Sequence, residues 1–326
     1  MSTPAWTRCF SLEGKTALVT GGTSGIGFVA VQVLADAGAD IVAAGTPGHK
    51  HEDVVGRVTA LGRRAVVLTA DLAKPDEPGR LAREAIAAFG KIDILVNNAG
   101  IARNALLLEA TIEEWDATIA VNLRAPFLLA QAIAPQMIAR RAGKIINVSS
   151  QTCVVALVDH GAYMASKAGL NAPTKVMTLE WARYNIQSNA ICPTVVFTPM
   201  GQGVWGSPEK GGPMLAKIPL CRFGEPIEIA DAILFLASSA SDLISGDVLM
   251  LDGGYTAAGA GRAAANTLAD TICFQIAKRA RQRRLEHANV CTVAEAADAF
   301  GSPLPRHRHG RRKKTGCLTV PCASGQ

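Results

Sequence analysis

The sequence predicts an α/β protein, a Rossmann-type doubly wound parallel sheet of seven strands with helices on both faces. Over about the first 256 residues, short β-branched apolar runs alternate with longer helical patterns. The runs are apolar throughout, which is typical of parallel strands buried on both faces. A glycine-rich segment follows the first run, where a fold of this class turns from strand into helix.

The expected elements follow in order along the chain. The seven expected strands cover residues 16–20, 40–45, 65–70, 93–100, 144–150, 186–193 and 247–254. Helical patterns cover residues 25–37, 112–140 and 161–184. Right-handed crossovers would place any ligand crevice outside the carboxyl ends of the strands.

The charge divides the chain into two parts. Residues 257–326 hold 12 of the 33 Lys and Arg residues but only 4 of the 27 Asp and Glu residues, so the net charge of +6 comes from this segment. We expect a catalytic body over 11–256 and a basic, flexible extension over 257–326, with a helical segment at 276–288 and a disordered run at 306–316. The body shows no footprint for nucleic acid. The extension could bind phosphates or an acidic membrane, or be a solvated or out-of-frame appendage.

The composition favours the cytoplasm. The N-terminus has no apolar signal region, and no apolar run approaches the roughly 18 residues of a membrane span. The eight cysteines form no CxxC pair. We therefore expect reduced thiols, with neither a disulfide framework nor a metal site.

Two small-residue turns point to a flat, charged ligand. In "TGGTSGIG" (20–27), Gly21, Gly25 and Gly27 allow the tight turn that brings a pyrophosphate to a helix N-terminus, although a purely structural turn would look similar. In "NNAG" (97–100), Asn98 can bond to nearby backbone while the small residues leave room for a ring.

Tyr163 and Lys167 stand four residues apart and so share one helix face. An ammonium group about 4 Å away would lower the phenol pKa by about 3 units, toward the range of general acid/base catalysis. In an ordinary amphipathic helix the tyrosine would pack while the lysine reached water. Ser149 and Ser150 end an expected strand, and Asn122 lies in a long expected helix, where asparagine is mildly disfavoured.

Together these residues resemble the short-chain dehydrogenase/reductase family over residues 11–256, including the closing "DGGY". The family's spacing of 13 residues to the tyrosine selects Ser150 over Ser149. The resemblance implies that Tyr163 is the general acid/base, and that Ser150 orients the substrate oxygen. It also implies that Lys167 lowers the phenol pKa and bonds the nicotinamide ribose, while Asn122 positions a relay water. No metal is implied.

The same resemblance implies a site for NAD(H) or NADP(H). Its expected cofactor-binding residues are Gly21, Thr23, Ser24, Gly25, Ile26, Gly27, Gly45, Thr46, Asp71, Leu72, Asn98, Ala99, Gly100, Tyr163, Lys167, Pro193, Val196 and Thr198. Gly45 and Thr46 occupy the place where an acidic residue would mark NAD, and no arginine follows directly to hold a 2′-phosphate. His49, Lys50 and His51 are near enough to reach a phosphate. The sequence leans to NAD(H).

Two subgroups of the family are similar to parts of the chain. "CPTVVFTPM" (192–200), "VSSQ" (148–151), "PTKVM" (173–177) and "GQGVW" (201–205) resemble dicarbonyl/L-xylulose reductases, whereas "GADIVAAG" and "VTALGRRAVVLTADL" resemble deoxygluconate dehydrogenases. These resemblances imply a sugar, sugar acid or polyol substrate, with Ser150, Gln151, His160 and Trp205 in its pocket. His160 and Trp205 would alternatively pack a mobile lid.

Other functions remain open at this stage. An alternative enzymatic function is that of a 3-oxoacyl-carrier-protein reductase or a steroid-type ketone reductase of the same family. A non-enzymatic alternative is a cofactor-sensing protein with a nucleic-acid-binding tail, although a sensor need not keep a proton relay. The family also implies a homodimer or homotetramer paired through the helices near 112–140 and 161–184.

Overall fold

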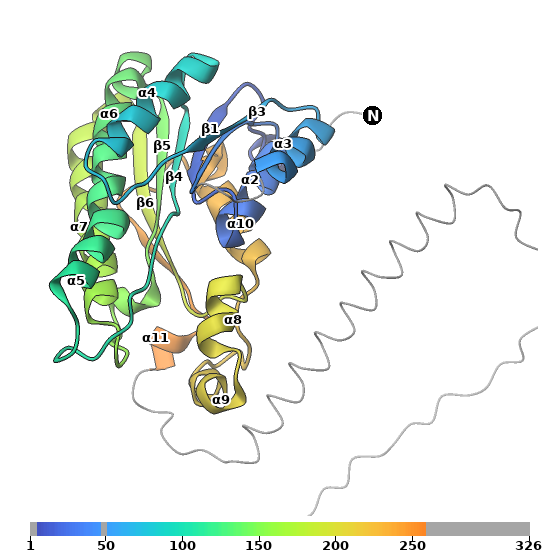
Figure 1. Ribbon diagram of the computed structural model, residues 1–326. Helices are drawn as coiled ribbons and strands as arrows, with labels where there is room; N and C mark the ends of the chain where they lie inside the picture. Colours follow the sequence, from blue (N-terminus) through green and yellow to red (C-terminus); the bar gives the residue numbers. More distant parts are fainter. Residues whose placement is uncertain (1–4, 47–50, 259–326) are drawn as a thin grey trace, which may run out of the picture. The chain divides into compact units, whose positions relative to one another are not determined.

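The computed structural model describes residues 5–46 and 51–258. Seven parallel strands form one sheet in the order β3-β2-β1-β4-β5-β6-β7 (Figure 1), which confirms the expected doubly wound sheet. The strands are β1 (Thr16–Thr20), β2 (Asp40–Gly45), β3 (Ala65–Thr69), β4 (Ile94–Asn97), β5 (Gly143–Val148), β6 (Ile186–Pro193) and β7 (Val248–Leu251).

Helices cover both faces of the sheet. The helices are α1 (Ala5–Arg8), α2 (Gly25–Asp36), α3 (His51–Ala60), α4 (Glu77–Phe89), α5 (Ile112–Ile119), α6 (Ala125–Arg140), α7 (Gly161–Trp181), α8 (Pro199–Trp205), α9 (Pro208–Ala216), α10 (Pro226–Ala237) and α11 (Tyr255–Ala258). Short turns η1 (Ala120–Arg124), η2 (Gln151–Cys153), η3 (Ala182–Tyr184) and η4 (Ser239–Ser241) adjoin them. Helices α2, α3 and α10 lie on one side of the sheet, and α4, α6 and α7 on the other (Figure 1).

The alternation of strand side chains builds a core on each face of the sheet. Ala17 and Val19 of β1 pack into one buried cluster with α2 and α10, while Leu18 belongs to the cluster under α4 and α6. Each strand therefore buries successive residues on opposite faces, which explains why its sequence is apolar throughout.

The strand ends define where a ligand can lie. Strand β1 pairs with β2 on one side and β4 on the other, so the chain order reverses between β1 and β4. Strand β4 ends at Asn97 rather than residue 100, and β5 ends at Val148 rather than residue 150. Both polar segments thus lie just past their strands, at the carboxyl edge where open α/β sheets bind ligands.

The expected helix over 112–140 is interrupted. Helix α5 passes through a π-helical turn, η1, before α6 continues to Arg140. By length and composition alone, the stretch Ile112–Arg140 is one that could span a membrane, but half of its most apolar window is buried. Leu129, Ile133 and Met137 are fully buried in the core of the sheet's α4/α6 face, as in a core helix of a globular fold.

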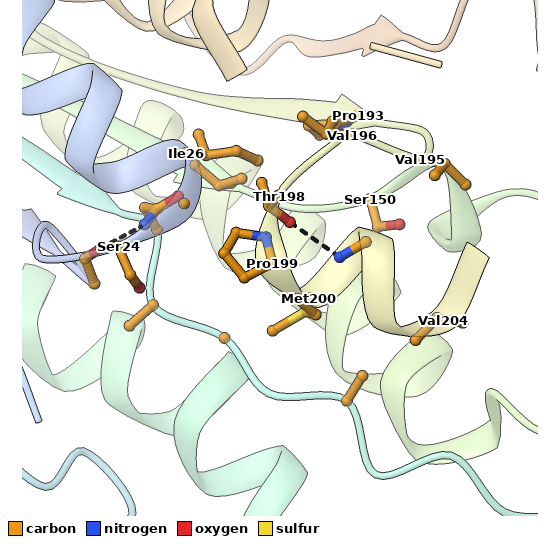
Figure 2. A pocket seen from close by; sticks show the side chains of 18 of the residues that line it. Ser24, Ile26, Ser150, Pro193, Val195, Val196, Thr198, Pro199, Met200 and Val204 are labelled. Atoms are coloured by element: carbon orange, nitrogen blue, oxygen red, sulfur yellow. Dashed lines mark hydrogen bonds between the residues drawn. The ribbon is translucent and has the colours of Figure 1, made fainter. Parts of the chain in front are cut away.

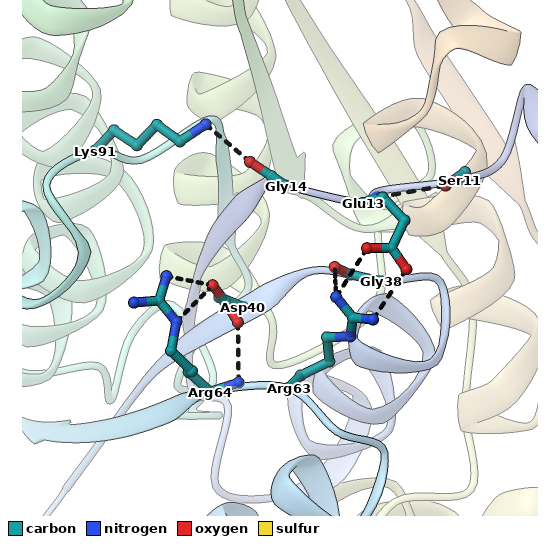
Figure 3. A network of polar contacts seen from close by, with 8 residues as sticks. All are labelled: Ser11, Glu13, Gly14, Gly38, Asp40, Arg63, Arg64 and Lys91. Carbon is teal, nitrogen blue, oxygen red and sulfur yellow. Dashed lines mark hydrogen bonds and ion pairs between the residues drawn. The ribbon is translucent and has the colours of Figure 1, made fainter.

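A polar network fastens the opposite edge of the sheet (Figure 3). Arg64 donates hydrogen bonds to Asp40 at the start of β2, and Arg63 donates two to Glu13 at 2.9 Å. Burial acts to raise the pKa of Asp40, but the hydrogen bonds from Arg64 hold that pKa below its usual value. This charged cluster lies at the amino ends of the strands, away from the ligand edge, so we interpret it as structural.

Four cysteines lie in the described part of the chain, and all are free thiols. The sulfur atoms of Cys153 and Cys192 are 3.6 Å apart. The helix expected at 276–288, the disordered run expected at 306–316 and residues 259–326 generally lie outside the described residues, as do His49 and Lys50.

Candidate active site

A cavity of about 650 Å³ opens at the carboxyl edge of the sheet. Ser24 and Ile26 line it from the start of α2, and Ser150 lines it from the end of β5. The segment that enters α8 contributes Thr198, Pro199, Met200 and Val204 (Figure 2). The Thr198 hydroxyl accepts a hydrogen bond from the Gly201 amide at 3.1 Å, which caps α8. The cavity therefore has a glycine-turn end and an α8 end.

The glycine turn is a cradle that side chains would fill. Gly21 and Gly25 have positive φ angles of 64° and 52°. A Cβ atom on Gly27 would lie 2.2 Å from the Gly21 carbonyl oxygen. Ser24 precedes α2 without a side-chain cap, so the first amides of the helix are left for a ligand. These features fit the pyrophosphate of a dinucleotide.

The "NNAG" turn is fastened to the glycine turn. The Asn98 side-chain amide donates to the Thr20 carbonyl at 2.9 Å, and the Asn98 backbone amide donates to the Thr20 hydroxyl at 3.0 Å. This confirms the expectation that Asn98 bonds nearby backbone. Ala99 and Gly100 then line the cavity beside it.

Asn122 is fully buried in the π-helical turn η1. Its side chain accepts from the Ile101 amide and donates to the Ile101 carbonyl, both at 2.9 Å, and it also donates to the Ser166 hydroxyl at 3.1 Å. The amide thus ties the helix to the loop after "NNAG" and to α7. Asn122 does not line the cavity.

Tyr163 and Lys167 project from α7 into the cavity. The Lys167 ammonium donates to the Val148 carbonyl at 2.7 Å and lies 5.7 Å from the centre of the Tyr163 ring. Burial lowers the pKa of Lys167 to about 8. Burial also raises the pKa of the Tyr163 phenol, and a hydrogen bond with the Ser150 side chain offsets part of that rise.

The expected lowering of the phenol pKa by Lys167 is therefore not found in this structure. The expectation assumed a Lys167 ammonium about 4 Å from the phenol and included only its attraction for the phenolate. The structure adds the cost of taking both charged forms out of water, which acts in the opposite direction and is larger.

The two serines at the end of β5 have different surroundings. The Ser149 hydroxyl donates to the Lys167 carbonyl at 2.9 Å, which fixes α7 against the sheet. The Ser150 hydroxyl accepts from the Thr152 amide at 3.2 Å and faces Tyr163. Both serines line the cavity, and Ser150 is the one whose side chain contacts Tyr163.

The α8 end of the cavity holds the residues expected to bind substrate. His160 stacks against Trp205 with ring centres 6.4 Å apart, and its ring is nearly perpendicular to that of Tyr163, with ring centres 6.1 Å apart. Gln151 is 2% exposed, and its side-chain oxygen has no hydrogen-bond partner in the structure.

Most of the expected ligand-binding residues meet in this one cavity. Those that line it are Gly21, Thr23, Ser24, Gly25, Ile26, Asn98, Ala99, Gly100, Ser150, Gln151, His160, Tyr163, Lys167, Pro193, Val196, Thr198 and Trp205. Gly27, Gly45, Thr46, Asp71 and Leu72 do not line it. Gly45 packs against Thr23, Leu72 belongs to the core, and Asp71 accepts from the Ala73 amide at 3.2 Å and pairs with Lys74.

Some lining residues carry no signal in the sequence. Asp53 and Arg57 of α3 reach the glycine-turn end, and Asn104 reaches the α8 end. The Arg57 guanidinium lies 5.3 Å from the centre of the Phe28 ring and donates to Gln32 at 3.2 Å. None of these residues stands in a recognisable spacing, because loops and a neighbouring helix bring them in.

The fold and the cavity define an NAD(P)-binding oxidoreductase of the α/β class. A family model described as enoyl-(acyl carrier protein) reductase matches residues 21–256. With the Ser–Tyr–Lys arrangement in the cavity, this match shows that the chain belongs to the short-chain dehydrogenase/reductase family.

Several characterised proteins are similar to this chain over nearly their whole length. It is 40% identical over 256 residues to an NAD-dependent glycerol dehydrogenase of Listeria innocua, covering 78% of this chain and 99% of that protein. It is 42% identical over 249 residues to a 2-dehydro-3-deoxy-D-gluconate 5-dehydrogenase of Escherichia coli, covering 76% and 98%. It is 40% identical over 247 residues to an L-xylulose reductase of Bos taurus, covering 76% and 98%. Both expected subgroups are thus found among its relatives.

Other relatives widen the comparison. The 3-oxoacyl-[acyl-carrier-protein] reductase of Thermotoga maritima is 39% identical over 244 residues, covering 74% of this chain and 98% of that protein. The crystal structure of a gluconate 5-dehydrogenase from Burkholderia cenocepacia, in complex with NADP and tartrate, superposes with a TM-score of 0.74 at 37% identity, covering 77% of this chain and 99% of that one.

Proposed function

We propose that this chain interconverts a secondary alcohol and a ketone on a sugar, sugar acid or polyol, using NAD(H) or NADP(H). The observation that carries this proposal is the convergence of Ser150, Tyr163 and Lys167 on one cavity that also contains the glycine cradle. A bound nicotinamide would supply the hydride. The chain's own residues then have to bind, orient and exchange the proton.

Tyr163 is the proposed general acid/base. In reduction its phenol would give a proton to the carbonyl oxygen, and in oxidation the phenolate would take the hydroxyl proton. Ser150, which is hydrogen-bonded to Tyr163, holds the same substrate oxygen and stabilises its developing charge. This role requires only that both hydroxyls face one point, and the cavity lining supports that arrangement.

Lys167 and Asn122 are the proposed supporting residues. Lys167 would bond the nicotinamide ribose and return a proton to Tyr163, and its lowered pKa of about 8 suits a group that exchanges protons near neutrality. Asn122 would position a water on this relay. A Cβ placed on Gly100 would lie 3.4 Å from both Asn122 Oδ1 and Lys167 Nζ, so the two side chains border the same small space.

We propose NAD(H) as the preferred cofactor. Arg57 is the arginine that lines the cavity, but Gln32 and the Phe28 ring already hold its guanidinium. Neither Gly45 nor Thr46 offers a cation for a 2′-phosphate. The measurement is kcat/KM with each cofactor, and a value at least about tenfold higher with NADP(H) would contradict the proposal.

The 3-oxoacyl-carrier-protein reductase alternative is favoured by the Thermotoga maritima relative. The steroid-type and cofactor-sensing alternatives are supported by no comparable observation. A panel of polyols, ketoses, sugar acids and acyl-thioester ketones separates these functions. Turnover of the acyl-thioester ketone alone would identify the chain as an acyl-carrier-protein reductase. If no substrate in the panel gives a turnover that Tyr163→Phe abolishes, the cofactor-sensing alternative would remain.

Three further proposals complete the description. Residues 11–256 form the catalytic domain, and residues 257–326 are a basic extension without a catalytic role. The enzyme is a cytoplasmic homodimer or homotetramer that binds a small carbonyl or alcohol substrate. Exposed apolar side chains on the paired helices support the oligomer, namely Trp115 of α5, Phe127 of α6, and Leu179 of α7, which is 84% exposed.

A further inference from the structure

Asn104 and His160 meet across the α8 end of the cavity. The Asn104 side-chain nitrogen lies 3.3 Å from His160 Nε2, and both residues line the cavity. The backbone holds the two segments together, since the Ala105 amide donates to the Asp159 carbonyl at 3.0 Å. Asp159 itself adopts a left-handed conformation with φ of 63°, which directs the following His160 inward.

The surroundings of His160 assign its ring hydrogens. Nδ1 lies 2.8 Å from the Val158 carbonyl oxygen and 2.5 Å from a carboxylate oxygen of Asp159. Both of these atoms can only accept, so Nδ1 carries a hydrogen. In the neutral ring Nε2 is therefore an acceptor, and the Asn104 amide donates to it.

We propose that Asn104 is a specificity-determining residue that, with His160, recognises a hydroxyl group on the carbon next to the reacting carbon. The hydroxyl would lie between the two side chains, donating to His160 Nε2 and accepting from the Asn104 amide. Asn104 is the partner that moves, because its side chain is exposed whereas His160 is 8% exposed and is held at Nδ1 by the Val158 carbonyl. This inference rests on the proposed function and narrows its substrate class.

The pair selects a neutral hydroxyl over other groups. A hydroxyl can donate and accept at once, whereas a carboxylate or a thioester has no hydrogen to give to Nε2. The Asp159 carboxylate behind His160 adds negative charge that disfavours an acid at this position. The buried Gln151 oxygen that lacks a partner also calls for a hydrogen-bond donor. The expected substrate therefore carries a hydroxyl on the carbon next to the reacting carbon, as an α-hydroxy ketone does and a 3-oxoacyl thioester does not.

A pair of matched ketones tests this inference. Hydroxyacetone and acetone differ by the one hydroxyl group next to the carbonyl carbon. We measure kcat/KM for both with wild type, Asn104→Ala and the control Arg103→Ala, which changes an exposed neighbour that does not line the cavity. Because one neutral hydrogen bond is lost, Asn104→Ala should lower kcat/KM for hydroxyacetone by about three- to tenfold and leave acetone unchanged. Arg103→Ala should change neither.

Each other outcome has a definite meaning. An equal fall for both ketones in Asn104→Ala, or no fall for either, would overturn the role of Asn104 while leaving the proposed oxidoreductase intact. A wild type that reduces neither ketone and oxidises no polyol with either cofactor would overturn the proposed function and this inference together. Unchanged melting temperatures establish that the variants are folded.

Discussion

Replacing Gly27 by alanine tests whether the cradle is as tight as the structure shows. The added Cβ would lie 2.2 Å from the Gly21 carbonyl oxygen and 2.4 Å from the Asn98 side-chain nitrogen. Neither atom can turn aside, because one is backbone in a left-handed turn and the other is bonded to the Thr20 carbonyl at 2.9 Å. Helix α2 must therefore shift. Overpacking of this kind costs about 1–3 kcal/mol, which lowers the melting temperature by about 2–12 °C in a body of this size.

The assay combines thermal melting with titration of the cofactor. We expect Gly27→Ala to melt lower and to bind the cofactor more weakly, because the shifted helix carries the amides that would face the pyrophosphate. Gly56→Ala is the matched control, since it stands in a helix with open space around it and should raise stability by up to about 1 kcal/mol. If the two alanine variants melt and bind alike, the cradle is not close-packed and the argument fails.

Three further predictions concern catalysis, protonation and the extension. Tyr163→Phe should lower turnover by about 10²–10⁴-fold while cofactor affinity, measured by titration, stays the same; an equal loss of affinity would contradict the assigned role. The buried Lys167 has a pKa of about 8 against an ordinary 10.5, so between these pH values the unfolded chain binds more protons than the folded chain. The free energy of unfolding of wild type, relative to that of Lys167→Met, should therefore rise by about 3 kcal/mol from pH 8 to 10.5 in denaturant titrations. A constant difference across that range would refute the shift. Truncation after Ala258 should preserve kcat/KM, melting temperature and oligomer size, and a collapse of activity or assembly would show that the extension belongs to the enzyme.

The sheet could be predicted because its signal is local. A parallel strand covered on both faces must be apolar along its length, and each of the seven expected runs overlaps one of the strands of the sheet. The polar residues that follow β4 and β5 could be placed at the ligand edge for the same reason. Only the ends were displaced, by one to three residues, because hydrogen bonding at a strand end depends on the neighbouring strand.

The rest of the site depends on contacts between distant segments. The Asn122 side chain in the π-helical turn is hydrogen-bonded to Ile101, which lies 21 residues earlier. The apolar periodicity of this helix does not predict the turn. Asn104 enters the cavity because a backbone bridge joins Ala105 to His160. Arg57 comes from a neighbouring helix. Tertiary packing brings such residues into the cavity, so their spacing along the sequence could not predict that they line it.

The pKa values of Tyr163 and Lys167 depend on burial as well as on the attraction between their charges. Attraction between a phenolate and an ammonium group stabilises only the doubly charged state, whereas burial penalises each charge separately. The raised pKa of Tyr163 and the lowered pKa of Lys167 both show burial as the larger effect. A phenol whose pKa is raised is protonated at neutral pH, which suits the proposed role of Tyr163 as the proton donor in reduction. In oxidation the proposed role of Tyr163 as a base would require the phenol to lose that proton first, which the raised pKa disfavours, so we expect reduction to be the easier direction at neutral pH.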